Sequence, residues 1–153
     1  MPSLIETNVN KEIAKIMHIE IPKKDKKHTN LIGLIDHAIR SGIDFSAVEK
    51  TRAAIKINDS PFSDLLGVSL STLKRYRTHN TKLSVSASDR FYRLIRIFAL
   101  ASTVLGSADN ATEWLREPQF AFDGQTPFEL IKTEVGTKQV ENFLMRAEYG
   151  DLL

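Results

Sequence analysis

The chain has 153 residues, enough for one domain or for two small domains that share an interface. It contains no cysteine, so disulfides and thiolate zinc sites are excluded and a reducing compartment is expected. Its start lacks the charged and apolar regions of a signal peptide, and no apolar run has the length of a membrane span. We therefore expect a cytoplasmic protein without a membrane partner.

The formal net charge of +2 hides an uneven distribution along the chain. Residues 1–98 hold 17 Lys and Arg against 10 Asp and Glu, a net charge of +7, whereas residues 99–153 hold 4 against 9, a net charge of −5. Between residues 68 and 98 there are 7 basic residues and a single acidic one, Asp89. A basic front and an acidic back suggest two partners of different charge.

The spacing of apolar residues predicts an all-α fold of about eight helices, because no segment has a convincing strand pattern. Residues 1–29 are expected to form an N-terminal extension, in part helical, whose helical pattern ends at Pro22. Asn30 can cap a second helix that stops at Gly42, and a third helix follows Asp44. A helical DNA-binding domain is expected over residues 30–85.

The next helix is predicted to open at Ser60 and Pro61, with serine as the N-cap and proline in the first turn. Gly67 ends it, and another helix must start at once, capped by Ser69 or Ser71. These two short helices are followed by a polar connector over residues 78–85.

A second domain is expected over residues 86–153. Its longest helix is predicted over residues 87–105, begins at a capping box formed by residues 86–89, and is buried in its apolar second part. Further helix starts are predicted at Asn110, at Thr126–Pro127 and after Gly136. Trp114 and Phe128 are expected in the core, because large aromatic side chains in small helical domains are mostly packed.

The segment GVSLSTLKRYR over residues 67–77 is typical of a helix-turn-helix: a glycine turn joins two short helices, and the second helix is basic. Gly67 lies where the turn needs a positive φ, and Ser63 is small where the helices cross. The two helices are expected to pack through apolar residues on both sides of the turn: Phe62, Leu66, Val68, Leu73 and Tyr76.

A helix-turn-helix places its second helix in the major groove with the N-terminal residues nearest to the base edges. The candidates for this role are Ser69, Leu70, Ser71, Thr72 and Lys74, with Leu70 able to touch a thymine methyl group. Phosphate contacts are expected from Arg75, Arg77 and Lys82. Arg90, Arg93 and Arg96 recur every three residues and could extend the basic face, although a solvated face explains Arg90 and Arg93 better.

With these elements placed, the remainder of the chain resembles the Xre/MbcA/ParS antitoxins, which pair with RES-domain toxins in type II toxin–antitoxin systems. The resemblance covers about residues 31–153 and depends on several spaced motifs in order. They are SDR at 88–90, WL followed by proline at 114–118, G-x-TP at 124–127, EVG at 134–136 and EYG at 148–150.

The resemblance implies an antitoxin with two roles. The helix-turn-helix would repress its own operon, and the C-terminal domain would bind the toxin that is encoded next to it. Toxins of this family deplete NAD⁺, and the antitoxin covers their active-site entrance. Because an NAD⁺ pocket is expected to contain arginines, the acidic C-terminal half suits such a surface. The segment 141–153 is predicted to face the toxin, with candidate residues Glu141, Arg146, Glu148, Tyr149, Gly150 and Asp151.

An enzyme is not expected, and neither is a cofactor. The four histidines share no metal-ligand spacing, and neither G-x-G-x-x-G, a Walker lysine motif nor G-x-S-x-G occurs. Two other binding functions stay open: a stand-alone repressor whose C-terminal domain dimerises or senses a ligand, and a scaffold that binds only proteins. A homodimer is expected, because a helix-turn-helix that reads a palindrome requires two copies.

Overall fold

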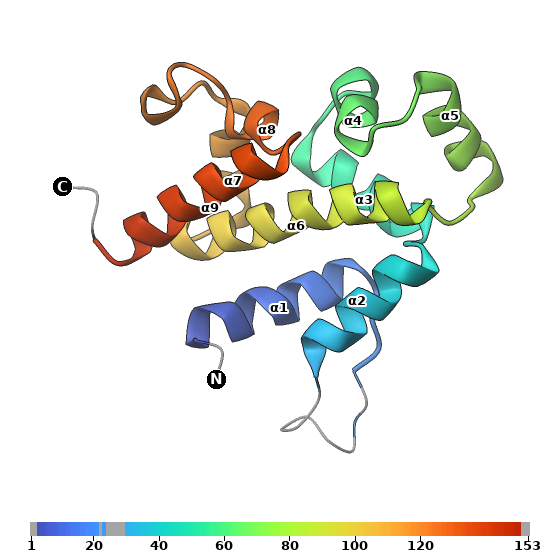
Figure 1. Ribbon diagram of the computed structural model, residues 1–153, viewed down its shortest axis with the longest axis horizontal. Coiled ribbons are helices and arrows are strands. Elements are labelled where there is room, and N and C mark those ends of the chain that lie inside the picture. Colours follow the sequence, from blue (N-terminus) through green and yellow to red (C-terminus); the bar gives the residue numbers. More distant parts are fainter. Residues whose placement is uncertain (1–2, 22, 24–29, 151–153) are drawn as a thin grey trace. The chain divides into compact units, whose positions relative to one another are not determined.

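The computed structural model describes residues 3–21, 23 and 30–150. Within these residues the fold is all-α, with nine α-helices, one short 3₁₀ helix and no strand, so the predicted fold class is confirmed (Figure 1). The chain divides into two compact units, residues 1–92 and 93–153. The division falls inside α6 (Val85–Leu105), whereas the sequence suggested a boundary just before this helix.

The first unit contains five complete helices and the start of α6. They are α1 (Leu4–Ile16), α2 (Leu31–Ser41), α3 (Phe45–Ile55), α4 (Asp59–Leu66) and α5 (Leu70–His79). The second unit contains the rest of α6 and four short elements that follow it: α7 (Ala108–Arg116), the 3₁₀ helix η1 (Phe120–Phe122), α8 (Pro127–Leu130) and α9 (Glu134–Glu148).

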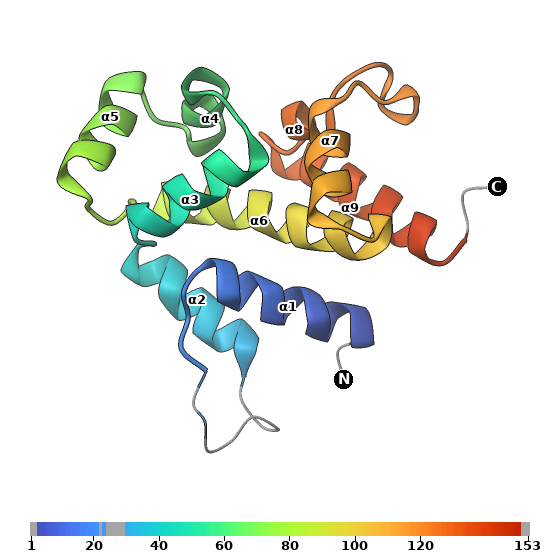
Figure 2. The same cartoon turned by 180° about the vertical axis from the view of Figure 1, so that it is seen from behind.

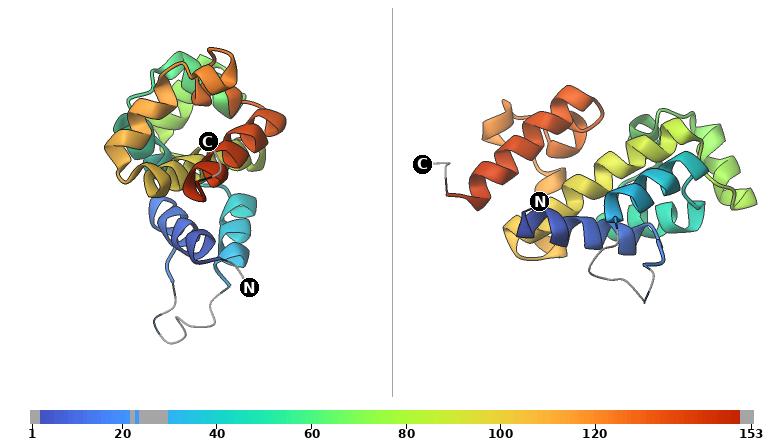
Figure 3. Two further views of the ribbon diagram at one scale, coloured as in Figure 1. Left: turned by 90° about the vertical axis from the view of Figure 1, so that its left-hand side faces the viewer. Right: turned by 60° about the horizontal axis from the view of Figure 1, so that its bottom comes forward.

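Within the N-terminal extension, residues 4–16 form helix α1, which belongs to the first unit. Helix α1 begins with a capping box, in which the Ser3 hydroxyl accepts from the Glu6 amide and the Glu6 carboxylate accepts from the Ser3 amide. Its buried residues are Val9, Ile13 and Ala14. In both views of Figure 3 this helix runs beside α2, against which it packs. Most of the charged run over residues 23–28 lies outside the described residues.

Helix α6 is tied to the junction between α2 and α3. The fully buried hydroxyl of Ser88 accepts a hydrogen bond from the Ile43 amide at 3.0 Å. Close by, an isolated antiparallel bridge pairs Asp44 with Lys82. Gly42 has a φ of 87°, and a Cβ there would lie 2.5 Å from the Leu83 carbonyl oxygen. The loop after α5 is therefore held against the start of α3 by backbone contacts.

Several predicted helix starts are wrong by a few residues. The N-cap of α4 is Asn58, not Ser60, and α6 starts at Val85 with the Ser84 hydroxyl accepting from the Ala87 amide. Ser107 caps α7 where Asn110 was expected, and α9 starts at Glu134, so Gly136 lies inside it. By contrast, Ser69 caps α5, and the capping box at Thr126 opens α8 as predicted. Serine and threonine cluster near each start, so residue type alone does not select the cap.

The second unit is organised around α9 and a set of aromatic side chains. Trp114 stacks on Phe143, with ring centroids 5.9 Å apart, and Phe122 contacts both rings edge-on. Phe128 is buried, as expected, and Trp114 is half-buried within this cluster. A Cβ on Gly136 would lie 1.9 Å from the Leu130 carbonyl oxygen, so this glycine allows α9 to start directly after α8 (Figure 2).

Among the described residues, no single helix is long and apolar enough to cross a membrane. Helices α6 and α7 have sufficient length and apolar character only when taken together, and they are bent by 117° where they join.

Candidate functional site

Helices α4 and α5 are joined by a turn of three residues. Helix α4 ends at Gly67, whose φ of 68° lies in the left-handed region that favours glycine. The Val68 amide donates to the Ser63 carbonyl at 3.0 Å, which closes the end of the helix. Ser69 then caps α5 by accepting from the Thr72 amide. This is the helix–glycine turn–helix unit that the sequence predicted.

The packing of this unit follows most of the predicted apolar positions. Phe62, Leu66 and Leu73 are fully buried, Ser63 is buried, and Val68 is half-buried. Tyr76 makes its aromatic contact with α3. Its ring stacks on Phe45 of α3, with centroids 5.9 Å apart, and its hydroxyl accepts from the Ser84 amide at 3.3 Å. Tyr76 therefore holds α5 against α3 and the following loop.

The first turns of α5 present a polar surface to solvent. Ser69, Leu70, Ser71, Lys74 and Arg75 are exposed, and Leu70 keeps 42% of its surface accessible. Thr72 is half-buried, and its hydroxyl accepts from the Ser69 hydroxyl. Lys82 is exposed at the bridge to Asp44. The exposure of Leu70 shows that it is not a core residue, which leaves it free to make a contact.

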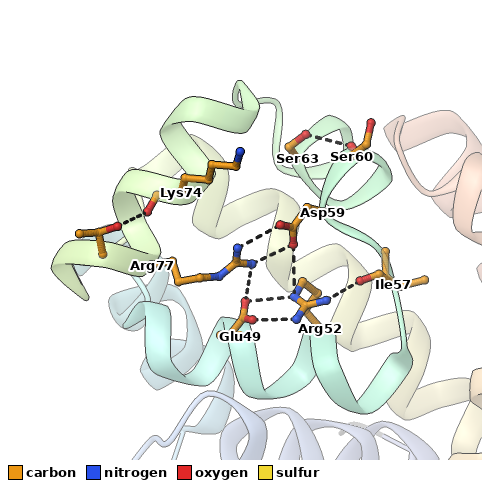
Figure 4. A network of polar contacts seen from close by, with 9 residues as sticks. Glu49, Arg52, Ile57, Asp59, Ser60, Ser63, Lys74 and Arg77 are labelled. Carbon is orange, nitrogen blue, oxygen red and sulfur yellow. Dashed lines mark hydrogen bonds and ion pairs between the residues drawn. The ribbon is translucent and has the colours of Figure 1, made fainter.

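Arg77 of α5 takes part in an ion pair with acidic residues of α3 and α4. Its guanidinium group donates from Nη1 and Nη2 to the two carboxylate oxygens of Asp59, at 3.0 and 2.8 Å, and from Nη2 to Glu49 at 3.2 Å. Figure 4 shows these side chains pointing toward one another from α5, α4 and α3. In this structure the guanidinium group of Arg77 is engaged by two carboxylates, and its predicted phosphate contact stays a prediction.

Arg52 completes the ion-pair network of Glu49, Arg52, Asp59 and Arg77. It binds Glu49 through two hydrogen bonds of 2.7 and 3.0 Å and donates to the Ile57 carbonyl at 2.7 Å, and its Nε lies 3.8 Å from Asp59 (Figure 4). This network was not predicted from the sequence. Only the i, i+3 spacing of Glu49 and Arg52 could have indicated part of it.

The network changes the acidity of its members. The hydrogen bond from Arg77 is the main cause that lowers the pKa of Asp59, although burial opposes it. Burial acts to raise the pKa of Glu49, but hydrogen bonds from Arg52 and Arg77 outweigh burial, and that pKa is also lowered. The pKa of Arg77 is raised, chiefly by its hydrogen bond to Asp59. Both carboxylates are therefore held in the charged form.

The arginines of α6 do not form one basic face. Arg90 lies against the turn of the helix-turn-helix, where a Cβ on Gly67 would be 1.7 Å from its Nη1. Arg96 donates to the Glu141 carboxylate inside the second unit. Arg93 is half-buried. Of the SDR motif, Ser88 thus anchors the α2–α3 junction and Arg90 contacts Gly67, which gives two of its three residues a structural role.

The predicted toxin-facing residues differ in solvent exposure and in whether they are bound within the second unit. The side chain of Glu141 is only 19% exposed and is bound to Arg96, so it is part of the second unit's own structure. Arg146, Glu148, Tyr149 and Gly150 are exposed at the end of α9 and directly after it, with Tyr149 59% accessible. Asp151 lies outside the described residues.

No group of three or more His, Cys, Asp or Glu residues that could hold a metal ion is found in the described part of the chain. The geometry instead defines a helix-turn-helix protein with a second, separate helical unit.

Comparison with known proteins identifies both parts. The Antitoxin Xre-like helix-turn-helix domain matches residues 35–96, and the Antitoxin Xre/MbcA/ParS C-terminal toxin-binding domain matches residues 100–150. The two matches follow each other and together cover most of the chain. The chain belongs to the family of Xre-type antitoxins, which confirms the resemblance seen in the sequence.

Individual relatives agree with this assignment. The chain is 39% identical over 83 residues to Antitoxin Xre of Pseudomonas putida, a match that spans about half of either chain, 54% of this one and 52% of the relative. It is 25% identical to Antitoxin Xre of Yersinia enterocolitica, over 76% of this chain and 79% of the relative. It is also 24% identical to the Prs ADP-ribosylating antitoxin of a Sphingobium strain, over 73% of this chain and 76% of the relative.

Proposed function

We propose that this chain is the antitoxin of a type II toxin–antitoxin pair, which inhibits a RES-domain toxin and represses its own operon. The observation that carries this proposal is the order of two matched domains: a helix-turn-helix, then a domain described as toxin-binding. The charge division supports it, since the net charge of +7 falls on residues 1–98 and that of −5 on residues 99–153. A basic surface suits DNA, and an acidic one suits a basic protein surface.

DNA binding would use the exposed start of α5. In this arrangement Leu70, Ser71 and Lys74 reach base edges, while Arg75 and Lys82 bind phosphate. Ser69 and Thr72 hold the first turn of the helix in shape, since each is engaged at the cap. Arg77 is left out of the DNA-contacting set, because its guanidinium group is bound to Asp59 and Glu49. A dimer would place two such helices on a palindromic operator.

Toxin binding would use the second unit, with exposed residues near the end of α9 as contacts: Arg146, Glu148, Tyr149 and Gly150. The proposed action is to cover the active-site entrance of a toxin that consumes NAD⁺. An acidic surface placed there would meet the arginines that an NAD⁺ pyrophosphate requires. In such a complex the antitoxin acts by exclusion and performs no chemistry itself.

The name of the Sphingobium relative favours a second candidate for the toxin's reaction. That protein is called a Prs ADP-ribosylating antitoxin. ADP-ribosylation transfers ADP-ribose from NAD⁺ to a target and releases nicotinamide, whereas simple depletion hydrolyses NAD⁺. Either toxin must hold the same dinucleotide, so the proposed role of the second unit is the same for both.

The DNA-binding role is tested by fluorescence anisotropy with a duplex from the region upstream of the operon. Arg75→Ala is expected to weaken binding and to reduce the salt slope by about 1, as the loss of one phosphate contact predicts. Arg116→Ala, an exposed arginine of the second unit, is the matched control and should bind as the wild type does. Binding that is insensitive to salt and to Arg75 would contradict the proposal.

The toxin-binding role is tested by expressing the adjacent toxin gene with and without this chain. Growth and NAD⁺ content are expected to fall with the toxin alone and to recover on co-expression. A truncation after Glu148 should lose protection, whereas Arg75→Ala should keep it. The truncation stops there because Leu144 is fully buried and its removal would unfold the unit. A blot for protein-bound ADP-ribose distinguishes transfer of ADP-ribose from hydrolysis of NAD⁺. If expression of the adjacent gene is harmless, only the function of a stand-alone repressor remains.

A further inference from the structure

The second unit displays one aromatic side chain entirely to solvent. Phe120 is 100% exposed, which no other large apolar residue of the described chain equals. It lies inside the segment that matches the toxin-binding domain. A phenylalanine side chain in water costs free energy that burial against a partner would recover. This residue therefore marks a surface on which a partner can gain affinity.

Phe120 is held in place by its own loop. In residues 119–125, the Gln119 amide donates to the Gln125 carbonyl at 3.0 Å, and the Gly124 amide donates to the Gln119 carbonyl at 3.0 Å. Between them the chain makes one 3₁₀ turn, ended by Asp123 and Gly124 in left-handed conformations with φ of 53° and 84°. The loop thus closes on itself through backbone hydrogen bonds.

The same loop is fixed to the body of the unit at two points. Phe122 is buried in contact with Trp114 and Phe143. The Gln119 side-chain amide donates to the carbonyls of Trp114 and Glu117, at 3.4 and 3.1 Å. Because its neighbours on both sides are anchored, Phe120 is presented by a preorganised backbone, and little conformational entropy would be lost on binding.

The charged residues nearest to Phe120 in the sequence are acidic. Glu117 and Asp123 are both exposed within three residues of it, and no Lys or Arg occurs between Arg116 and Lys132. An aromatic side chain bordered by carboxylates is complementary to an apolar pocket with cationic groups at its edge. The Phe120 loop is thus suited to a basic protein surface and is unsuited to DNA.

We propose that Phe120 is an anchor residue that inserts into an apolar pocket, bordered by Arg or Lys, on the toxin. This inference rests on the proposed function and deepens it, because it adds the loop over residues 119–125 to the exposed end of α9 as a contact surface. The loop supplies the desolvated aromatic contact, and Glu117 and Asp123 supply charge at its edge.

The test is the affinity of the full-length chain for the purified RES-domain toxin from the adjacent gene, measured by biolayer interferometry. Phe120→Ala is expected to raise the Kd at least thirtyfold, the size of effect typical of an interface hot spot, about 2 kcal/mol. Phe120→Leu should recover part of the affinity. Leu4→Ala, an apolar residue 78% exposed on α1, is the matched control and should change the Kd less than about twofold.

The outcomes separate the two proposals. Wild-type protein that fails to bind the toxin would overturn the proposed function and this inference with it. Tight binding that is equal in wild type and Phe120→Ala would overturn the inference alone. An unchanged Kd together with loss of self-association in light scattering would show that a second copy of this chain covers Phe120, which also overturns it. Thermal melts should coincide, since Phe120 is unpacked in the isolated chain.

Discussion

Arg77, in the last turn of α5, forms a bidentate ion pair with Asp59, in the first turn of α4. Each charge also lies at the helix end where the backbone dipole favours it, the anion at an N-terminus and the cation at a C-terminus. Glu49 of α3 binds the same guanidinium group. One side chain thus connects the three helices α3, α4 and α5 and fixes the position of α5, which carries the proposed base-reading residues.

Removing this connection should affect stability, whereas removing the neighbouring arginine should not. Arg77→Met is expected to lower the free energy of unfolding by about 1–2 kcal/mol, because two partly buried carboxylates lose their shared partner. Arg75→Met is the control: Arg75 is exposed, so the unfolding free energy should stay within about 0.5 kcal/mol of wild type. Urea unfolding followed by circular dichroism measures both. Equal stability of the two variants would contradict the structural role of Arg77.

The network also predicts how stability depends on pH. The pKa values of Asp59 and Glu49 lie below their ordinary values of 3.8 and 4.5, so the unfolded chain binds protons more readily than the folded one. Their contribution is therefore complete above about pH 5 and is lost as pH falls through 4.5 and 3.8 toward the lowered values. The double variant Glu49→Gln, Asp59→Asn should lose stability at pH 7 and show a weaker decline between pH 5 and 3. A decline as steep as that of the wild type would assign the acid sensitivity to other carboxylates.

Gly67 combines a positive φ with a close neighbour. Gly67→Ala is expected to cost about 1–2 kcal/mol, because alanine disfavours the left-handed region and its Cβ displaces the Arg90 guanidinium group. Gly106→Ala is the matched control: its φ of 89° is also left-handed, but nothing lies within 4 Å of the added Cβ. In an Arg90→Ala background the penalty at Gly67 should fall, while that at Gly106 stays the same. Chemical denaturation of the two glycine variants, of Arg90→Ala and of the two double variants gives this comparison. Unchanged penalties would show that Arg90 does not press on the turn.

The two glutamates of α9 that were assigned to the toxin should behave differently. Glu141→Gln is expected to lower the melting temperature, because the half-buried Arg96 loses its partner. Glu148→Gln leaves the fold unchanged, since Glu148 is exposed, and should instead slow association with the toxin and weaken its salt dependence. Differential scanning fluorimetry measures the melting temperature, and association kinetics measure the rate of toxin binding. A stable Glu141→Gln protein that binds toxin slowly would reverse this assignment.

Much of the helix-turn-helix could be predicted from residue order. Gly67, Ser69 and the apolar positions Phe62, Leu66 and Leu73 act through neighbours a few residues away, and the structure places them as expected. The first residue of a helix could not be predicted in the same way, because neighbouring residues are chemically equivalent caps. This applies to Ser84 and Ser86 before α6 and to Ser107 and Asn110 before α7. Which of them is used depends on where tertiary packing lets the helix begin.

The sequence by itself determined that the chain is all-α, that a glycine turn joins a short helix to a basic one, and that charge divides along the chain. These properties depend on composition and on contacts within one or two helical turns. Only the tertiary structure decided which charged side chains form ion pairs. Arg77 binds partners 18 and 28 residues away in the sequence, and Arg96 binds Glu141 at a separation of 45 residues. It also left Phe120 in solvent and buried Phe122 two residues later. Such choices depend on residues far apart in the chain, because an ion pair or a buried ring requires a partner that only folding brings within reach.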